Sequence, residues 1–232
     1  MLPESITEKF IFKSDAVFAN LPNNIKELFL EQMQIREYKK GQNLFTEGTY
    51  PAGIYFIKKG KVKKYKSLNG GKEQIIYVCC EGELLGYASL MGEETYPDSA
   101  TSLTKAVVGF LPKDKLQKLI EEHDEISKML IKNLSHEFGV LINFIAAFTQ
   151  KPVRERVALT LLILWEKFRD DLNEFDQVQI LLTREDLANM VGTAVETLVR
   201  VLHEFKKEEI ITTSGRAIRL LKPQELIEIA KY

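Results

Sequence analysis

The stretch from residue 182 to residue 211, LTREDLANMVGTAVETLVRVLHEFKKEEII, decides the fold, because it predicts two short helices joined by a turn. Thr183 can cap the first helix, and Asp186 three residues later completes a capping box. Gly192 then ends that helix, since glycine tolerates the left-handed conformation that closes a helix C-terminus. The stretch therefore has the layout of a helix-turn-helix.

The second helix begins near Thr193 or Ala194 and has the composition of a DNA recognition helix. Glu196 and Arg200 lie four residues apart, so they share one face at the end of the helix that enters the major groove. An arginine can bond bidentately to guanine and a glutamate can accept from cytosine. The alternatives are that Glu196 completes a capping box begun by Thr193, and that Glu196 and Arg200 form an ordinary surface ion pair.

The residues after the second helix favour DNA binding. Two strand-like pieces, residues 210–213 and 217–221, flank a turn at Gly215. They predict a small β-hairpin wing behind the helix-turn-helix, which a chance surface helix would lack.

Composition limits the class of protein. The chain has 232 residues, of which 45% are hydrophobic and 28% charged, and this is ordinary for a globular protein of one or two domains. The net charge is −1, so any basic surface for nucleic acid must be local. No apolar run approaches the roughly 18 residues of a membrane span, and MLPESITEKF lacks a signal pattern. We therefore expect a cytoplasmic protein without a membrane segment.

The cysteines and histidines do not indicate a metal centre. Cys79 and Cys80 are adjacent, so on a strand one is buried and the other lies on the opposite face, which disfavours a shared metal site or a disulfide. A redox role for them is the alternative, but they are too few for an iron–sulfur cluster. The histidines show no metal-ligand spacing. We predict no metal and no cofactor.

The first half of the chain indicates a β-roll behind a short helical cap at residues 14–34. From Arg36 to Pro112, short β-rich runs alternate with glycine turns, which predicts a double-stranded β-roll or jelly roll. A metalloenzyme of the cupin type would need several histidines inside the barrel, and this range contains none. We expect no catalytic residues. One hairpin is crowded with lysines that favour a solvated face: Lys58, Lys59, Lys61, Lys63, Lys64 and Lys66.

Helix returns from Lys113, and it carries an apolar seam at alternating spacings of three and four residues. The seam consists of Ile131, Leu134, Phe138, Leu141, Ile145 and Phe148. It could pack on its own β-roll, but a second apolar stripe can do so instead, formed by Leu130, Val140 and Phe144. We therefore expect the seam to form a dimer interface with a second subunit.

These parts predict an α+β protein in three regions. Residues 1–112 form N-terminal helices and the β-roll, residues 113–149 the dimerisation helix region, and residues 150–232 a winged helix-turn-helix.

This order resembles the Crp/Fnr family of bacterial transcription regulators over nearly the whole chain. The matching pieces are KKGQNLFTEG, GIYFIKKGKVKKY and GELLGYASL in the β-roll, together with the helix-turn-helix stretch and the wing SGRAIRL. The resemblance implies a cyclic-nucleotide-binding-like sensor and a homodimer. It also implies a palindromic operator in double-stranded DNA, and RNA polymerase as a further partner.

The resemblance also implies DNA-contacting positions: Thr183, Arg184, Val195, Glu196, Thr197 and Arg200. The cyclic AMP receptor branch has Arg-Glu-Thr at the start of the recognition helix. Here the run is Val-Glu-Thr, which is more similar to the Fnr branch, although Val199 stands where that branch has a serine.

The sensor departs from the cyclic-nucleotide binders of the family. Those proteins hold the ribose with a Gly-Glu pair and the cyclic phosphate with an Arg-Ser-Ala run, whereas this chain has Gly86-Tyr87 and Asp98-Ser99-Ala100. Asp98 would place one anion against another, so we expect no binding of cyclic AMP. The resemblance places an effector pocket of unknown ligand at Gly86, Tyr87, Asp98 and Ser99.

Three possibilities stay open for this sensor: another ligand, no ligand, or a redox response at Cys79 or Cys80. The Fnr-type N-terminal cysteine cluster is absent from the sequence. The alternative to a regulator is a non-catalytic ligand-binding or protein-interaction module of the same fold that does not bind DNA.

Overall fold

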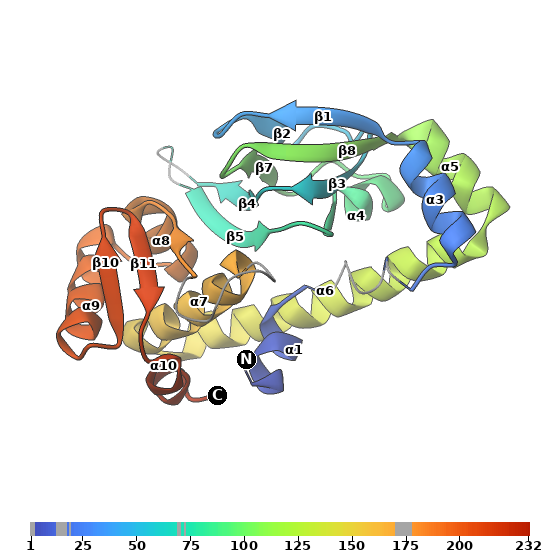
Figure 1. Ribbon diagram of the computed structural model, residues 1–232. Coiled ribbons are helices and arrows are strands. Elements are labelled where there is room, and N and C mark those ends of the chain that lie inside the picture. Colours follow the sequence, from blue (N-terminus) through green and yellow to red (C-terminus); the bar gives the residue numbers. More distant parts are fainter. Residues whose placement is uncertain (1–2, 13–17, 19, 69–70, 72, 170–177) are drawn as a thin grey trace. The chain divides into compact units, whose positions relative to one another are not determined.

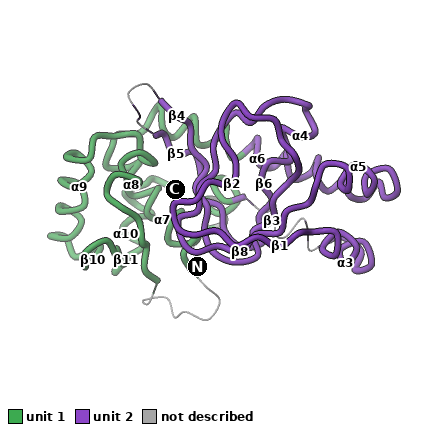
Figure 2. Tube along the Cα trace, turned by 90° about the horizontal axis from the view of Figure 1, so that it is seen from above, with its two compact units in different colours: residues 1–11, 140–232 green, residues 12–139 purple. Residues whose placement is uncertain are grey.

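The structure is a computed structural model that describes residues 3–12, 18, 20–68, 71, 73–169 and 178–232 (Figure 1). It divides into two compact units (Figure 2). One unit comprises residues 12–139, and the other comprises residues 1–11 and 140–232. The long helix α6, Asp124–Gln150, supplies residues to both units.

The first unit is built on two four-stranded antiparallel sheets. One sheet has the order β1 (Gln34–Tyr38), β8 (Ala106–Pro112), β3 (Gly53–Lys59) and β6 (Leu84–Leu85). The other has the order β2 (Asn43–Phe45), β7 (Ser99–Ser102), β4 (Val62–Ser67) and β5 (Glu73–Cys79). The two sheets confirm the predicted β-roll.

Helices share one apolar core with the first of these sheets. They are α3 (Asn23–Glu31), α4 (Tyr87–Met91), α5 (Lys113–Glu122) and the first turns of α6. Phe29 of α3, Ile54 of β3 and Leu111 of β8 are fully buried in this core. The helical cap expected at residues 14–34 is thus observed over α3, and residues 13–17 and 19 lie outside the described residues.

In the described residues, the second unit contains the C-terminal turns of α6 and several further helices. They are α7 (Val153–Phe168), α8 (Arg184–Val191), α9 (Val195–Lys207) and α10 (Pro223–Ala230). The short helix α1, Glu4–Phe10, also belongs here, and the ring of its Phe10 meets the ring of Phe144 at 5.3 Å. Trp165 of α7 is almost completely buried.

The predicted wing is present as an antiparallel sheet. Strand β11, Ala217–Leu220, pairs with β10, Ile211–Ser214, on one side and with β9, Ile180–Leu181, on the other. Strand β9, which immediately precedes α8, was not predicted, because a two-residue strand leaves no periodic signal. The order α8, α9, β10 and β11 confirms the winged helix-turn-helix.

Helix α6 carries two different apolar faces. Leu130, Val140 and Phe144 are buried, as predicted for the inner stripe. On the other face, Ile131, Leu134, Phe138 and Ile145 are exposed. None of the helices in the described ranges combines the length and the apolar character that crossing a bilayer requires.

At the start of β3, the backbone of Gly53 lies close to the backbone of the neighbouring strand β8, and a substitution at Gly53 tests this packing. A Cβ atom at Gly53 would lie 2.2 Å from the carbonyl oxygen of Leu111 on the neighbouring strand. Because backbone cannot move aside as a flexible side chain can, we expect Gly53→Ala to lower the free energy of unfolding by about 2–3 kcal/mol. Urea denaturation measures this change.

Gly139→Ala in α6 is the matched control, since a Cβ atom there would meet nothing within 4 Å. Alanine favours a helix over glycine, so the control should gain up to about 1 kcal/mol. Both variants should be compared at one protein concentration, because the stability of an oligomer depends on concentration. If the Gly53→Ala variant were as stable as the wild-type protein, the close approach of the two strands would be contradicted.

Candidate functional site

The first helix of the helix-turn-helix begins and ends as predicted. The Thr183 hydroxyl oxygen accepts a hydrogen bond from the Asp186 backbone N–H at 3.0 Å, and the hydroxyl donates to the Asp186 carboxylate at 2.7 Å. Gly192 ends α8 with φ 68° and ψ 49°, in the left-handed region. The side chain of Thr183 is therefore engaged in capping its own helix.

The second helix, α9, begins after Ala194, which carries no side-chain cap. The capping box between Thr193 and Glu196, one of the alternatives at the sequence level, is therefore not formed. Among the ion pairs of the described residues, Arg200 pairs with Glu204 at 3.5 Å and not with Glu196. The alternative of a Glu196–Arg200 ion pair is likewise not observed.

One face of α9 is free for a partner. Leu198, Val201, Leu202 and Phe205 are buried on the inner side. The exposed side carries Val195, Glu196, Val199 and Arg200, whereas Thr197 is half-buried. The Arg200 side chain is 71% exposed, so its guanidinium can reach a surface outside the protein.

An arginine from α7 fixes the position of the recognition helix. Arg154 donates to Glu204 at 3.1 Å and to Glu208 at 2.6 Å, and its guanidinium lies 4.7 Å over the ring of Phe205. All three partners belong to α9 or its C-terminal cap. Arg154 therefore holds the C-terminal half of α9 through two carboxylates and one buried ring.

The wing is tied to the start of α8. The Arg184 side chain points to the carbonyl oxygens of Gly215 and Arg216, at 3.4 and 3.5 Å. Gly215 forms the turn between β10 and β11 with φ 57°. Arg184, which the resemblance placed at a phosphate contact, thus also holds the tip of the wing. Arg216 and Arg219 of the wing are exposed and add local positive charge to a nearly neutral chain.

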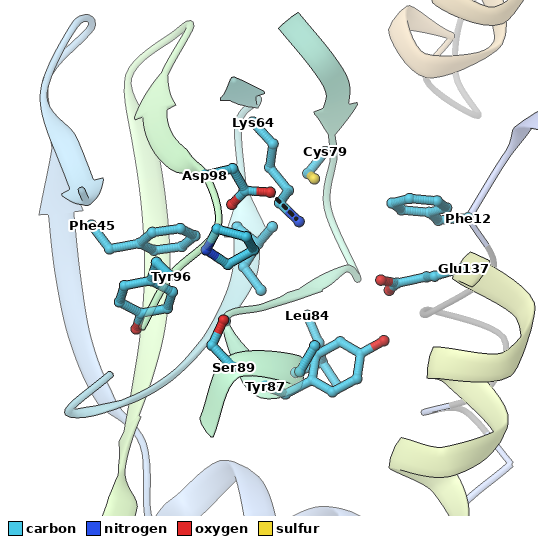
Figure 3. A pocket seen from close by; sticks show the side chains of 14 residues that line it. Phe12, Phe45, Lys64, Cys79, Leu84, Tyr87, Ser89, Tyr96, Asp98 and Glu137 are labelled. Atoms are coloured by element: carbon cyan, nitrogen blue, oxygen red, sulfur yellow. Dashed lines mark ion pairs between the residues drawn. The ribbon is translucent and has the colours of Figure 1, made fainter. Parts of the chain in front are cut away.

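A cavity of about 40 Å³ lies inside the β-roll (Figure 3). Gly86, Tyr87 and Asp98 of the predicted effector pocket line it, together with Lys64 and Glu137. Ser99 is not among the lining residues, and its hydroxyl accepts a hydrogen bond from the Glu47 backbone at 2.9 Å. Asp98 directly precedes β7, whose first residue is Ser99, and the two neighbouring side chains have different partners.

The centre of the cavity wall is an ion pair between Lys64 and Asp98, with 3.1 Å between the ammonium nitrogen and a carboxylate oxygen (Figure 3). The interpretation of Lys64 as a solvated hairpin lysine is therefore wrong. Lys64 follows Val62 by two positions on β4 and shares its inward face. The Asp98 side chain is only 9% exposed and lines the cavity.

The surroundings keep Lys64 charged. Burial alone would lower its pKa, but the Asp98 carboxylate, followed by Cys79 and Glu137, outweighs that effect, so the pKa of Lys64 lies above its usual value. The ammonium group is thus present in the cavity and already paired. Cys79, which contributes to this field, is buried on the cavity wall, whereas the neighbouring thiol of Cys80 is half-buried.

A second polar group joins the pocket to α6. The Tyr87 hydroxyl accepts a hydrogen bond from the Asn133 amide at 3.2 Å and is also hydrogen-bonded to Glu137. Burial, with Glu137 as the second cause, raises the pKa of Tyr87 far above its usual value. Asn133 and Glu137 were not among the predicted site residues. The available signal was their position on the inner face of α6, between Leu130 and Val140.

Aromatic side chains fill most of the remaining space. The rings of Phe45 and Tyr96 stack at 4.0 Å, and those of Phe12 and Tyr77 at 3.8 Å. A cavity of about 40 Å³ has room for roughly three water molecules. As it stands, the cavity is therefore far too small for a nucleotide.

The predicted seam of α6 is only partly exposed. Phe138 is 65% exposed, but Leu141 and Phe148 are half-buried, and the Phe148 ring meets Phe144 at 5.8 Å. Ile142, which was not among the predicted seam residues, is exposed on the same helix. A straight α-helix has 3.6 residues per turn, so positions that repeat every seven residues drift gradually around the helix. The exposed face therefore departs from the predicted seam.

Comparison with known proteins agrees with both parts of this description. Residues 35–123 match the cyclic nucleotide-binding domain, and residues 155–229 match the Crp-like helix-turn-helix domain. The fumarate and nitrate reduction regulatory protein of Vibrio cholerae is 30% identical over 215 residues, which cover 90% of this chain and 86% of that protein. The transcriptional activator protein anr of Pseudomonas aeruginosa is 29% identical over 195 residues, covering 84% and 80%.

Solved structures share the fold. FixK2 from Bradyrhizobium japonicum superposes with a TM-score of 0.72 at 22% identity, over 85% of this chain and 96% of that chain. A CRP/FNR-family regulator from Thermus thermophilus superposes with a TM-score of 0.70 at 21% identity, over 86% and 99%. The curated relatives are transcription regulators and not enzymes. With both domains matched in order and a relative aligned over most of its length, the chain belongs to the Crp/Fnr family of transcription regulators.

Proposed function

We propose that the protein is a homodimer that recognises a palindromic operator in double-stranded DNA through α9. The observation that carries this proposal is the exposed face of α9, where Glu196 and Arg200 do not pair with each other while Arg154 holds the C-terminal half of the helix. Arg200 pairs with Glu204 at 3.5 Å, but its side chain is 71% exposed, and such an exposed pair is weak enough to exchange for a base. On the alternative of a module that does not bind DNA, exposed Val195 and Val199 would remain without a partner on this face.

The recognition residues have distinct proposed roles. Arg200 donates to a guanine and Glu196 accepts from a cytosine, while Val195 and Val199 make apolar contacts in the groove. Thr183 and Arg184 lie at the start of α8, where backbone N–H groups and a guanidinium favour a phosphate. RNA polymerase is a further partner proposed from the family resemblance.

The exposed side of α6 is the proposed dimer interface. Ile131, Leu134, Phe138, Ile142 and Ile145 form an apolar stripe along this side, and all are exposed in one copy of the chain. A second copy, related by a two-fold axis, would cover it with the same residues. Two recognition helices then face successive major grooves about 34 Å apart, which requires a palindrome.

The sensor pocket is proposed not to bind cyclic AMP. Its one cavity-lining cation among the described residues, Lys64, is paired with Asp98, which would also repel a cyclic phosphate. The aromatic rings leave little volume for a base. The effector, if the pocket takes one, must therefore differ from a cyclic nucleotide in charge or size.

Selection from a random double-stranded DNA pool tests the proposed function. We expect the wild-type protein to enrich a palindrome with half-sites one helical turn apart. Absence of any enriched sequence would overturn the proposal, and enrichment of an asymmetric site would overturn the two-fold arrangement.

Arg200→Ala should weaken binding to the selected operator by about 1–3 kcal/mol and relax the preference at one base pair per half-site. Arg184→Ala is the comparison, because it should weaken binding to all sequences alike and lower the salt slope by about 1. Gel-shift titrations at several salt concentrations measure both effects. An unchanged selected sequence with Arg200→Ala would show that Arg200 does not contact a base.

Phe138→Glu together with Ile145→Glu should separate the dimer, because an unpaired charge buried in an interface costs about 3–5 kcal/mol. Sedimentation should find monomers at concentrations where the wild-type protein is dimeric. Lys132→Glu adds the same charge at an exposed position of α6 outside the stripe, so it should leave the dimer intact. A dimer that survives the double change would place the interface elsewhere.

Calorimetric titration with cyclic AMP and with cyclic GMP should give no saturable heat at micromolar concentrations. The reason is the unfavourable approach of a cyclic phosphate to Asp98 without a free cation. Operator affinity should be the same with and without either nucleotide. Saturable micromolar binding that also strengthens operator binding would contradict the proposed closed pocket.

A further inference from the structure

One side chain of α7 joins the end of α6 to the turn of the helix-turn-helix. Arg156 donates through Nη1 to the carbonyl oxygen of Phe148 at 3.0 Å and through Nη2 to the carbonyl oxygen of Gly192 at 3.1 Å. Phe148 lies in the last turn of α6, and Gly192 is the residue that ends α8. The three residues belong to one compact unit.

The two acceptors lie at the ends of two helices. The last four carbonyls of an α-helix have no intrahelical partner, and the partial negative charge at a helix C-terminus favours a cation. Phe148 carries one of these carbonyls of α6, whereas Gly192 is the left-handed residue that follows Val191 at the end of α8. The planar fork of Arg156 directs separate N–H groups to these two acceptors. A lysine ammonium is a point donor and cannot reproduce this fork.

The bridge connects the two parts of the molecule whose relative placement decides operator geometry. Phe148 lies in the last turn of the helix that carries the proposed dimer stripe, and Gly192 lies three residues before the start of α9. Arg154, two residues before Arg156 on α7, is bonded to the C-terminal half of α9. Arg156 itself contacts both the end of α6 and the turn before α9.

We propose that Arg156 is a positioning residue that sets which spacing of half-sites the dimer accepts. This inference rests on the proposed function, since spacing has a meaning only for a dimer with two recognition helices. Inserting one base pair displaces a half-site by about 3.4 Å along the DNA axis and about 34° around it. A rigid link between α6 and the helix-turn-helix tolerates such a shift poorly, whereas a loosened link adapts to it.

Loosening the link has two opposite consequences for binding. The preferred operator binds less tightly, because the orientation of each recognition helix must then be fixed on binding. Operators with a wrong spacing lose less affinity than the preferred operator does, because the loosened helices can follow the displaced half-site. The ratio of the affinity for the preferred operator to that for an operator of wrong spacing therefore measures how firmly the recognition helices are positioned. This ratio does not depend on the fraction of active protein.

The test compares the selected operator with operators that carry one base pair more or one fewer between identical half-sites. Arg156→Gln keeps one amide donor without charge, and Arg156→Lys keeps the charge without the fork. In both variants we expect the wild-type discrimination between spacings to fall by about tenfold, as loss of one or two charge-assisted hydrogen bonds allows. The salt slope should stay at the wild-type value, because Arg156 is not proposed to contact a phosphate.

Arg169→Gln is the matched control. Arg169 follows the C-terminal end of the same helix and pairs with Glu166 at 2.8 Å, within α7 and its cap. This variant loses an arginine and an ion pair but touches neither Phe148 nor Gly192. It should keep the spacing preference of the wild-type protein.

The outcomes separate the inference from the proposed function. A wild-type protein that binds no operator, or binds all spacings alike, would overturn the proposed function and the inference with it. A wild-type protein with a clear preference that both Arg156 variants retain would overturn the inference alone. A folding defect lowers the active fraction equally for every operator, so it leaves the ratio unchanged and cannot imitate the expected result.

Discussion

Helix α6 has to satisfy two apolar faces at once. Leu130, Val140 and Phe144 are buried within their own chain, whereas Phe138 and Ile145 face outward. A helix that is apolar on both sides has no stable place on a monomer surface, because one stripe always remains in water. The inner stripe is satisfied by folding, and the outer stripe is the proposed dimer interface. On the inner side, Asn133 and Glu137 add polar contacts to Tyr87 of the pocket.

Charge compensation shapes the pocket. A buried lysine without a partner would lose its proton or destabilise the fold, because removal of a charge from water costs several kcal/mol. Asp98 provides the compensating charge for Lys64 inside the chain. On the proposed function, the same ion pair also occupies the cation that a cyclic phosphate would need. Change at these two positions has to be coupled, since either residue alone would be an unpaired buried charge.

Local signals were sufficient for the fold, whereas the pocket depends on contacts between distant residues. The cap at Thr183 and the left-handed end at Gly192 are decided within a few residues, so the sequence predicts them well. Strand alternation with Val62 indicates that Lys64 points inward, but its charge alone predicted a solvated side chain. Only the contact with Asp98, 34 positions later in the chain, explains how a lysine can lie there. The departure of Ser99 from the pocket, and the outward position of Ile142, required the actual register and helical pitch.

Two arginines on one helix explain how the DNA-binding unit can be both small and well ordered. Arg154 acts on side chains of α9, whereas Arg156 acts on backbone carbonyls at the ends of α6 and α8. Backbone acceptors have fixed positions, so a bond to them transmits orientation more faithfully than a bond to a flexible carboxylate. The carboxylates of Glu204 and Glu208 instead let the recognition helix adjust by small rotations while it stays attached. Under the proposed function, the unit is held more firmly at α6 than at α9. This is the distribution of rigidity that the proposed recognition of two half-sites by one dimer would use.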